Sequence, residues 1–265
     1  MNKNNILKKA KQVLNIESEA INKLAKSLNE SFFRAVSLIV KNEGKLILSG
    51  VGKSGNIASK IAASFTSTGM PSVYLNPVDA SHGDMGIVND GDILILLSNS
   101  GESHELSDLI DFAKKKNIKI ISITSNKKSL ISKNSDISII LPKHKEADKL
   151  NTIPTTSTTL TLALGDALCC TVLDIRNFDK KSFRELHPGG KIGKKLKTLH
   201  DIMDLEIPII KIDSSIKDAV LTMTEKKYGC AVMVEKNMKI KGILTDGDLR
   251  RAIKNIDLDD KAISI

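Results

Sequence analysis

A run of five large aliphatic residues at 93–97 constrains the fold of this chain more than any other feature. Such a run is typical of a strand that is buried on both faces, as in a parallel sheet. A polar turn, Ser-Asn-Ser-Gly-Glu-Ser, follows at 98–103, and apolar residues then recur at helical spacing up to Ala113. Because a helix N-terminus presents free amides and the positive end of its dipole, this turn is a candidate anion site. Its candidate hydroxyl donors are Ser98, Ser100 and Ser103, although a solvated turn with Ser103 as N-cap explains the same residues.

Other apolar segments alternate with helical patterns along the first 175 residues. Strands are predicted at 45–49, 72–75, 118–124 and 136–141, and helical patterns at 6–28, 32–40, 56–65, 106–113 and 160–173. This alternation predicts an α/β fold with a doubly wound parallel sheet. Ligands of such sheets bind at the carboxyl ends of the strands, which is where the polar and glycine-rich loops of this chain fall.

The loop after the first predicted strand is rich in glycine. Residues 50–55 match the G-x-G-x-x-G pattern of dinucleotide-binding folds, so a dehydrogenase has to be weighed. The acidic residue that such a site needs after its second strand is not well placed, because Asp79 comes late. A Walker-type phosphate loop fails as well, since Ile47 stands where its first glycine belongs. The loop still offers Lys53 and Ser54 at the start of a helix, beside glycines that indicate close approach of the backbone.

Two further loops contain a histidine beside small residues. His82 lies in the loop at 78–86, and His187 lies in the glycine-rich loop at 184–193. A surface histidine is the plain alternative for each of them. Between these loops, Glu146 follows the strand at 136–141, and a hydroxyl-rich segment at 154–159 opens the long apolar helix. Five hydroxyl residues at one helix start exceed what a single N-cap needs, which favours a binding role.

Composition excludes several classes of function. The net charge of +9 is spread over scattered lysines, which favours a solvated surface over a nucleic-acid site. No apolar run approaches the roughly 18 residues of a membrane span, and the N-terminus lacks the apolar core of a signal peptide. Cys169, Cys170 and Cys230 show no metal or disulfide spacing, and the adjacent Cys169 and Cys170 lie in an apolar stretch, which predicts core residues in a reducing cytoplasm. We therefore expect neither a nucleic acid nor a membrane as a partner.

The pattern changes near residue 201. The residues beyond it predict strand, helix, two strands and a helix. This unit of about 60 residues is small to be stable alone, so we expect it to pair with another copy. We predict two domains, at 1–200 and 201–265.

The motifs of the first 200 residues resemble, in type and order, those of the sugar-isomerase (SIS) domain family. The segments that carry the resemblance are 50–55, 64–69, 80–84, 98–103, 145–147, 154–159 and 187–190. The segment at 242–251 resembles a cystathionine-β-synthase (CBS) module. The resemblance implies a doubly wound SIS domain followed by a small α+β CBS module. The pair of CBS modules that is usual in the family is here a single module.

In function, the resemblance implies reversible aldose–ketose isomerisation of D-ribulose 5-phosphate and D-arabinose 5-phosphate, which feeds synthesis of the lipopolysaccharide sugar Kdo. Relatives of this kind are cytoplasmic, usually tetrameric, and need no cofactor. The family's catalytic set falls here on Lys53, Glu105, Glu146 and His187. The expected contacts to the sugar phosphate are Ser54, Gly69, Met70, His82, Ser98, Ser100 and Ser103.

The chemistry of isomerisation suits these residue types. A proton moves between C1 and C2 through an enediol, so the site needs a base and a group that stabilises an oxyanion. We assign the base to Glu146, with a pKa raised by burial, and a second acid–base role to Glu105. Lys53 would neutralise the enediolate, and His187 would carry a proton between the oxygens. In related isomerases a histidine comes from a neighbouring subunit, which here would be His82 or His187.

Two departures from the family pattern limit these expectations. Asn76 stands where some members carry a histidine associated with zinc, so we predict no metal. A single CBS module leaves open whether a nucleotide or another regulatory ligand binds near Thr245 and Asp248, where such modules often hold a ribose. The alternative function is a non-catalytic sugar-phosphate sensor, because SIS domains also serve in transcription regulators. The presence of all four catalytic residue types favours the enzyme, and a dehydrogenase ranks third.

Overall fold

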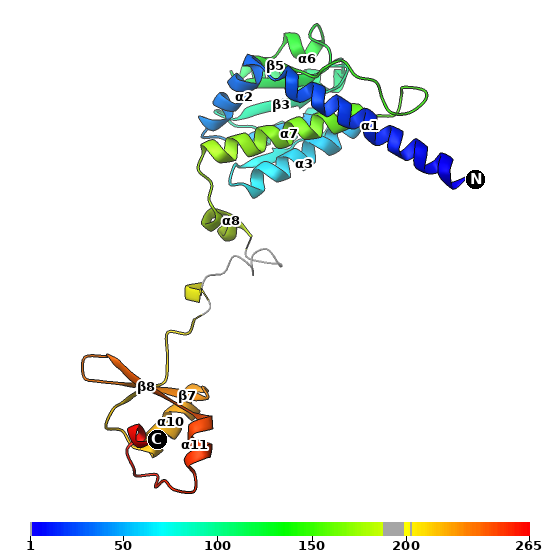
Figure 1. The fold of residues 1–265 in the computed structure, drawn as a ribbon. Coiled ribbons are helices and arrows are strands. Elements are labelled where there is room, and N and C mark those ends of the chain that lie inside the picture. Colours follow the sequence, from blue (N-terminus) through cyan, green and yellow to red (C-terminus); the bar gives the residue numbers. More distant parts are fainter. Residues whose placement is uncertain (1, 188–198, 202) are drawn as a thin grey trace. The chain divides into compact units, whose positions relative to one another are not determined.

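The computed structural model describes residues 2–187, 199–201 and 203–265. Its contacts divide the chain into two compact units, Met1–Leu196 and Lys197–Ile265, and each is described by itself (Figure 1). The assignment of these two parts to separate functional domains stays a prediction.

The first unit is built on a five-stranded sheet in the order β2-β1-β3-β4-β5. The strands are β1 (Leu46–Gly50), β2 (Ser72–Tyr74), β3 (Ile93–Leu97), β4 (Lys119–Thr124) and β5 (Ile137–Ile140), and all neighbours run parallel. Each residue of β3 is at most 1% exposed, because the strand is central and covered on both faces. The predicted doubly wound parallel sheet is confirmed.

Two layers of helices cover the sheet. One face packs against α1 (Lys3–Ser27), α2 (Glu30–Val40), α3 (Lys53–Ser67) and α7 (Thr156–Ile175), which lie together over the strands in Figure 1. The other face packs against α4 (Pro77–Ser81), α5 (Ser107–Lys115) and α6 (Leu130–Lys133). Side chains alternate between the two layers along each strand, so that Leu46 and Leu48 enter the first core and Ile47 enters the second.

Helix α7 is long and apolar enough, by length and composition, to cross a membrane, and it is the one such helix within the part of the chain that the structure describes. Its hydropathy has a simpler cause. Leu160, Leu164 and Leu168 are buried in the first core, where α7 packs against α1, α2 and α3. The helix is therefore the central helix of an α/β layer.

Two predicted loops contain more helix than expected. In the loop that holds His82, Asn76 caps a short helix, since its Oδ1 accepts from the amide of Val78 at 2.9 Å, and Pro77 takes the first helical position, where its missing amide does no harm. In the loop that holds His187, Asp179 caps helix α8 (Lys180–Leu186). The rest of that loop, Pro188 onwards, lies outside the described residues. A 3₁₀ turn, His104–Leu106, also precedes α5.

The second unit has the predicted order of elements. These are β6 (Ile209–Lys211), α10 (Ile216–Lys226), β7 (Cys230–Val234), β8 (Ile240–Thr245) and α11 (Asp246–Ala252), with 3₁₀ turns at Leu199–Asp201 and Ala262–Ser264. Strand β7 is central, parallel to β6 and antiparallel to β8. Capping boxes start both helices, and in α11 the box is formed by Thr245 and Asp248. The two residues proposed for a ribose site thus also hold the first turn of α11.

Candidate functional site

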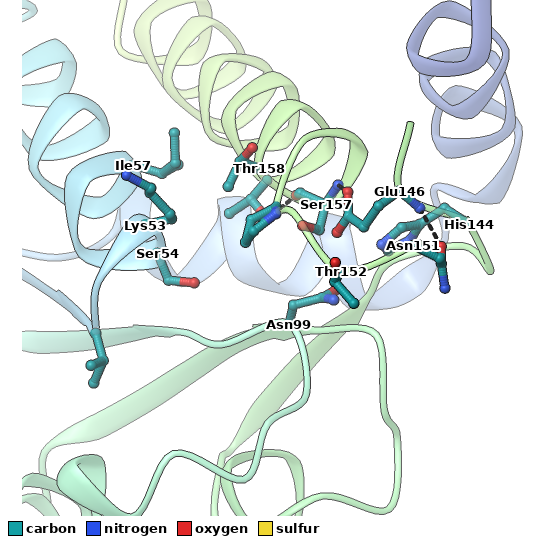
Figure 2. Close-up of a pocket in the computed structure, with 13 residues that line it drawn as sticks. Lys53, Ser54, Ile57, Asn99, His144, Glu146, Asn151, Thr152, Ser157 and Thr158 are labelled. Atoms are coloured by element: carbon teal, nitrogen blue, oxygen red, sulfur yellow. Dashed lines mark hydrogen bonds between the residues drawn. The ribbon is translucent and has the colours of Figure 1, made fainter. Parts of the chain in front are cut away.

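The order of the strands predicts where a ligand binds. After β1 the chain turns to β2 on one side, whereas β3 lies on the other side, so the loops that leave β1 and β3 diverge. Such a switch point opens a crevice at the carboxyl ends of the strands. A cavity of about 360 Å³ lies there (Figure 2). Its lining comes from three loops and comprises Val51, Lys53, Ser54, Ile57, Asn99, His144, Glu146, Asn151, Thr152, Pro154, Ser157, Thr158 and Thr161.

The loop after β1 places Lys53 and Ser54 in this cavity. Gly52 has φ +58°, a conformation that favours glycine, and Lys53 is the first residue of α3. The helix starts directly against the strand, because a Cβ on Gly55 would lie 2.6 Å from the carbonyl oxygen of Gly50. No side chain caps α3. The amides of Ser54 and Gly55 already donate to the carbonyl oxygen of Val51, at 3.1 and 3.4 Å, so the helix start offers an anion the positive end of its dipole and a lysine charge.

The serines of the turn after β3 are used differently from the expectation. The Oγ atoms of Ser98 and Ser103 lie 2.9 Å apart, and Ser98 Oγ also accepts from the amide of Gly101 at 3.1 Å. Ser100 Oγ accepts from the amide of Glu102 at 3.3 Å. These hydroxyls stabilise the turn itself, and none of the three serines is among the cavity's lining residues. Asn99, which the sequence reasoning missed, lines the cavity instead.

The segment after β5 carries the acidic group of the cavity. Exposed Lys143 and Lys145 alternate with half-buried His144 and Glu146, so the two inward side chains lie on the same side. Glu146 Oε2 accepts hydrogen bonds from the amide and the hydroxyl of Thr155, at 2.8 and 3.0 Å, and from the amide of Ser157 at 3.2 Å. His144 and Glu146 also line a second cavity of about 390 Å³, between α1 and this segment.

The pKa of Glu146 is lower than its ordinary value. Burial is the largest single influence and raises the pKa, but the hydrogen bonds from Ser157 and Thr155 together outweigh it. The expectation of a base whose pKa is raised by burial is therefore wrong. Glu146 is ionised at neutral pH and is ready to accept a proton.

Asp148 and Asn151 shape the loop that brings Glu146 to the start of α7. The carboxylate of Asp148 accepts from the amides of Leu150, Thr152 and Ile153 at 2.8, 3.0 and 3.1 Å. Asn151 has φ +54°, and its Oδ1 accepts from the amide of Glu146 at 2.7 Å. Desolvation raises the pKa of Asp148, but the hydrogen bonds from the three amides lower it by more, so this carboxylate is ionised. The chain thus folds back on itself between Glu146 and its partners.

The remaining predicted residues lie away from the cavity. Glu105 and His82 are exposed, on the 3₁₀ turn before α5 and at the end of α4, and neither lines the cavity. Gly69 and Met70 follow the far end of α3, whose 15 residues span about 22 Å. His187 lies near that same end, because Leu186 contacts the position of Gly69.

His187 is held by its own helix. Its Nδ1 lies 2.8 Å from the carbonyl oxygen of Phe183, and its ring stacks on the Phe183 ring with centroids 3.9 Å apart. The structure thus brings Lys53, Ser54 and Glu146 together at one end of α3. It places His187, Gly69 and Met70 at the other end.

Comparisons with known proteins agree with this architecture. The SIS domain family matches residues 39–170, and the CBS domain family matches residues 199–255. Arabinose 5-phosphate isomerase KdsD of Yersinia pestis is 45% identical over 258 residues, which are 96% of this chain and 79% of that protein. The protein of the same name from Escherichia coli K12 is 42% identical over 96% of this chain and 78% of that protein.

Solved structures extend the comparison. The structure of E. coli CFT073 c3406 in complex with arabinose 5-phosphate has a TM-score of 0.69 and 34% identity, and covers 71% of this chain and all of that one. Phosphoheptose isomerase GmhA of Neisseria gonorrhoeae, at 19% identity and a TM-score of 0.52 over 63% of this chain and 98% of that one, shares the fold alone. The cavity and the fold define a SIS-domain protein. The chain belongs, more narrowly, to the family of arabinose 5-phosphate isomerases that carry a SIS domain and a CBS module.

Proposed function

We propose that this protein is an isomerase that interconverts D-ribulose 5-phosphate and D-arabinose 5-phosphate. The observation that carries the proposal is the cavity at the switch point of the sheet, which is lined by Lys53, Ser54 and an ionised Glu146. The names of the relatives indicate the substrate, since proteins 40–45% identical to this chain are named arabinose 5-phosphate isomerase or probable arabinose 5-phosphate isomerase. We also propose that the reaction runs in the cytoplasm and feeds synthesis of Kdo.

The proposed mechanism needs no cofactor and no metal. In the direction from the ketose, Glu146 takes a proton from C1, and the electron pair forms the C1–C2 double bond of an enediolate. Lys53 stabilises the negative oxygen, because its charge is fixed beside the cavity before the reaction starts. His187 carries the proton of the C1 hydroxyl to the oxygen on C2, which leaves a carbonyl on C1, and return of the proton from Glu146 to C2 gives the aldose. Glu105 is the proposed second acid–base group, although it lies outside the cavity of the single chain.

The phosphate is proposed to bind at the start of α3. There Lys53, the hydroxyl group of Ser54 and the positive end of the helix dipole lie at one side of the cavity. The serines of the turn after β3 would have to give up their internal bonds to join this site. We therefore rank Ser54 above Ser98, Ser100 and Ser103 as the anchor.

A neighbouring copy is proposed to complete the site. His187 and the turn at Gly69 lie about 22 Å from Lys53 along α3, so within one chain they cannot reach the substrate there. We propose a homotetramer in which His187 enters the cavity of an adjacent subunit. Coexpression of Lys53→Ala and His187→Ala chains tests this arrangement. Mixed oligomers should regain activity that neither variant has alone, and two inactive variants that stay inactive together would place both residues in one chain's site.

The function itself is tested by incubating the purified protein with D-ribulose 5-phosphate and scoring D-arabinose 5-phosphate. Glu146→Gln should bind the sugar phosphate and lose turnover by about 10²-fold or more, since it removes the base. If the protein were a sensor, the wild-type protein would bind D-ribulose 5-phosphate without converting it. The named relatives give that alternative no support. Any regulatory ligand of the CBS module would change the rate without being consumed.

A further inference from the structure

His144 lies in the wall of the cavity, and no part of the mechanism above uses it. It lines this cavity together with Glu146, whereas the exposed Lys143 and Lys145 do not. Figure 2 shows His144 beside Glu146 and Asn151, on the side of the pocket away from Lys53 and Ser54. A ligand that fills the cavity therefore meets the lysine on one side and the imidazole on the other.

One nitrogen of this imidazole is already engaged. His144 Nδ1 lies 2.9 Å from the carbonyl oxygen of Pro142. A carbonyl oxygen only accepts, so Nδ1 must carry the hydrogen. In the neutral ring Nε2 is then an acceptor, and it has no partner among the residues that the structure describes.

The hydroxyl groups of a sugar chain need such an acceptor. Lys53 offers only donors, and Glu146 Oε2 already accepts from Thr155 and Ser157, which leaves Oε1 to take the proton from C1. A ligand hydroxyl that leaves water without a new partner weakens binding. We propose that Nε2 of His144 accepts a hydrogen bond from a hydroxyl group in the carbon chain of the substrate. This inference rests on the proposed function, because it takes the ligand to be a sugar phosphate.

Two variants separate this contact from the bond to Pro142. In His144→Asn, the side-chain amide can still donate to the Pro142 carbonyl, but nothing reaches the place of Nε2. In His144→Gln, the longer side chain can place an oxygen near that position and gives up the bond to Pro142. Lys143→Ala, at an exposed neighbouring position, is the matched control.

The measurement is calorimetric titration of the full-length protein with two probes. One is D-arabinitol 5-phosphate, which has the hydroxyls of the sugar but no carbonyl and cannot react, and the other is inorganic phosphate. We expect His144→Asn to bind the polyol phosphate about tenfold more weakly than wild type, as for one lost hydrogen bond. His144→Gln should recover part of that loss. Neither variant, nor the control, should change the affinity for phosphate.

Three results would overturn the proposal. Equal weakening of both probes would show that His144 acts on the phosphate or on the structure of the site. Normal binding by His144→Asn with weak binding by His144→Gln would show that only the Pro142 bond matters. Failure of the wild-type protein to bind the polyol phosphate would refute the contact directly. If the expected pattern appears and no isomerisation is detected, the proposed function fails while the contact stands.

Discussion

Substitution of Gly55 by alanine tests whether the start of α3 must lie directly against β1. A Cβ at this position would lie 2.6 Å from both the Gly50 carbonyl oxygen and the Tyr74 hydroxyl, whereas ordinary contacts begin at 3.4 Å. Strand β1 is paired on both sides, with β2 and β3, so the start of the helix has to move by most of an ångström. Alanine gains about 1 kcal/mol in helix propensity, and overpacking costs about 1–3 kcal/mol. We expect a small net loss of stability, visible as a Tm lower by a few degrees.

The effect on activity should exceed the effect on stability. Lys53 lies two residues before Gly55 and moves with it, and a displacement of about 1 Å in a reacting group can cost about 10²-fold in rate. The assay is kcat/KM for isomerisation beside a thermal melt. Gly86→Ala is the matched control, because a Cβ there meets nothing within 4 Å. A Gly55→Ala protein with wild-type activity would refute the argument that this close approach positions the lysine.

Three further predictions concern other parts of the first unit. The hydrogen bonds that lower the pKa of Glu146 contribute their full stability above pH 4.5, the ordinary pKa of this carboxyl, and that contribution is lost as the pH falls through the lower pKa of the folded state. A pH titration of activity should therefore show no loss of the ionised base between about pH 5 and 8. Asp148→Ala removes the acceptor of three loop amides and should lower kcat more than it changes phosphate affinity, with partial rescue by Asp148→Asn. Gly165→Ala drives a Cβ into the side chain of Ile61 between α3 and α7. It should lower the free energy of unfolding in a denaturant melt by about 1–3 kcal/mol, without a matching rise in KM.

The sequence predicted the sheet and part of the site for physical reasons. Ile93–Leu97 is apolar at every position, and such a run is typical of a strand covered on both faces. Lys53 and Ser54 follow a strand and two glycines, so their place at the start of a helix could be predicted from local rules. Glu146 follows the last strand of the sheet and therefore comes to the same edge.

Other features depend on contacts that local patterns do not contain. The serines at 98–103 satisfy one another and the turn amides, which leaves Asn99 as the residue that lines the cavity. Burial raises the pKa of Glu146, and the hydrogen bonds from Thr155 and Ser157, nine and eleven residues further along the chain, turn the net shift downward. A sequence pattern that places a carboxyl group in a half-buried segment predicts a raised pKa. The pKa is lowered here because a later segment of the chain donates hydrogen bonds to that carboxylate, and the local pattern does not contain this contact.

The distance between the two groups of motif residues has a further consequence for the assembly. Helix α3 separates them by about 22 Å, and no side chain spans such a gap. Two arrangements could close it: the segment after α7 could refold, or another copy could supply the second group. Refolding would have to remove Phe178, whose ring lies 3.0 Å from a Cβ built on Gly69, from the turn that it covers. It would also break the stacking of His187 on Phe183. A second copy leaves both contacts intact, so the packing at the far end of α3 favours a site shared between subunits.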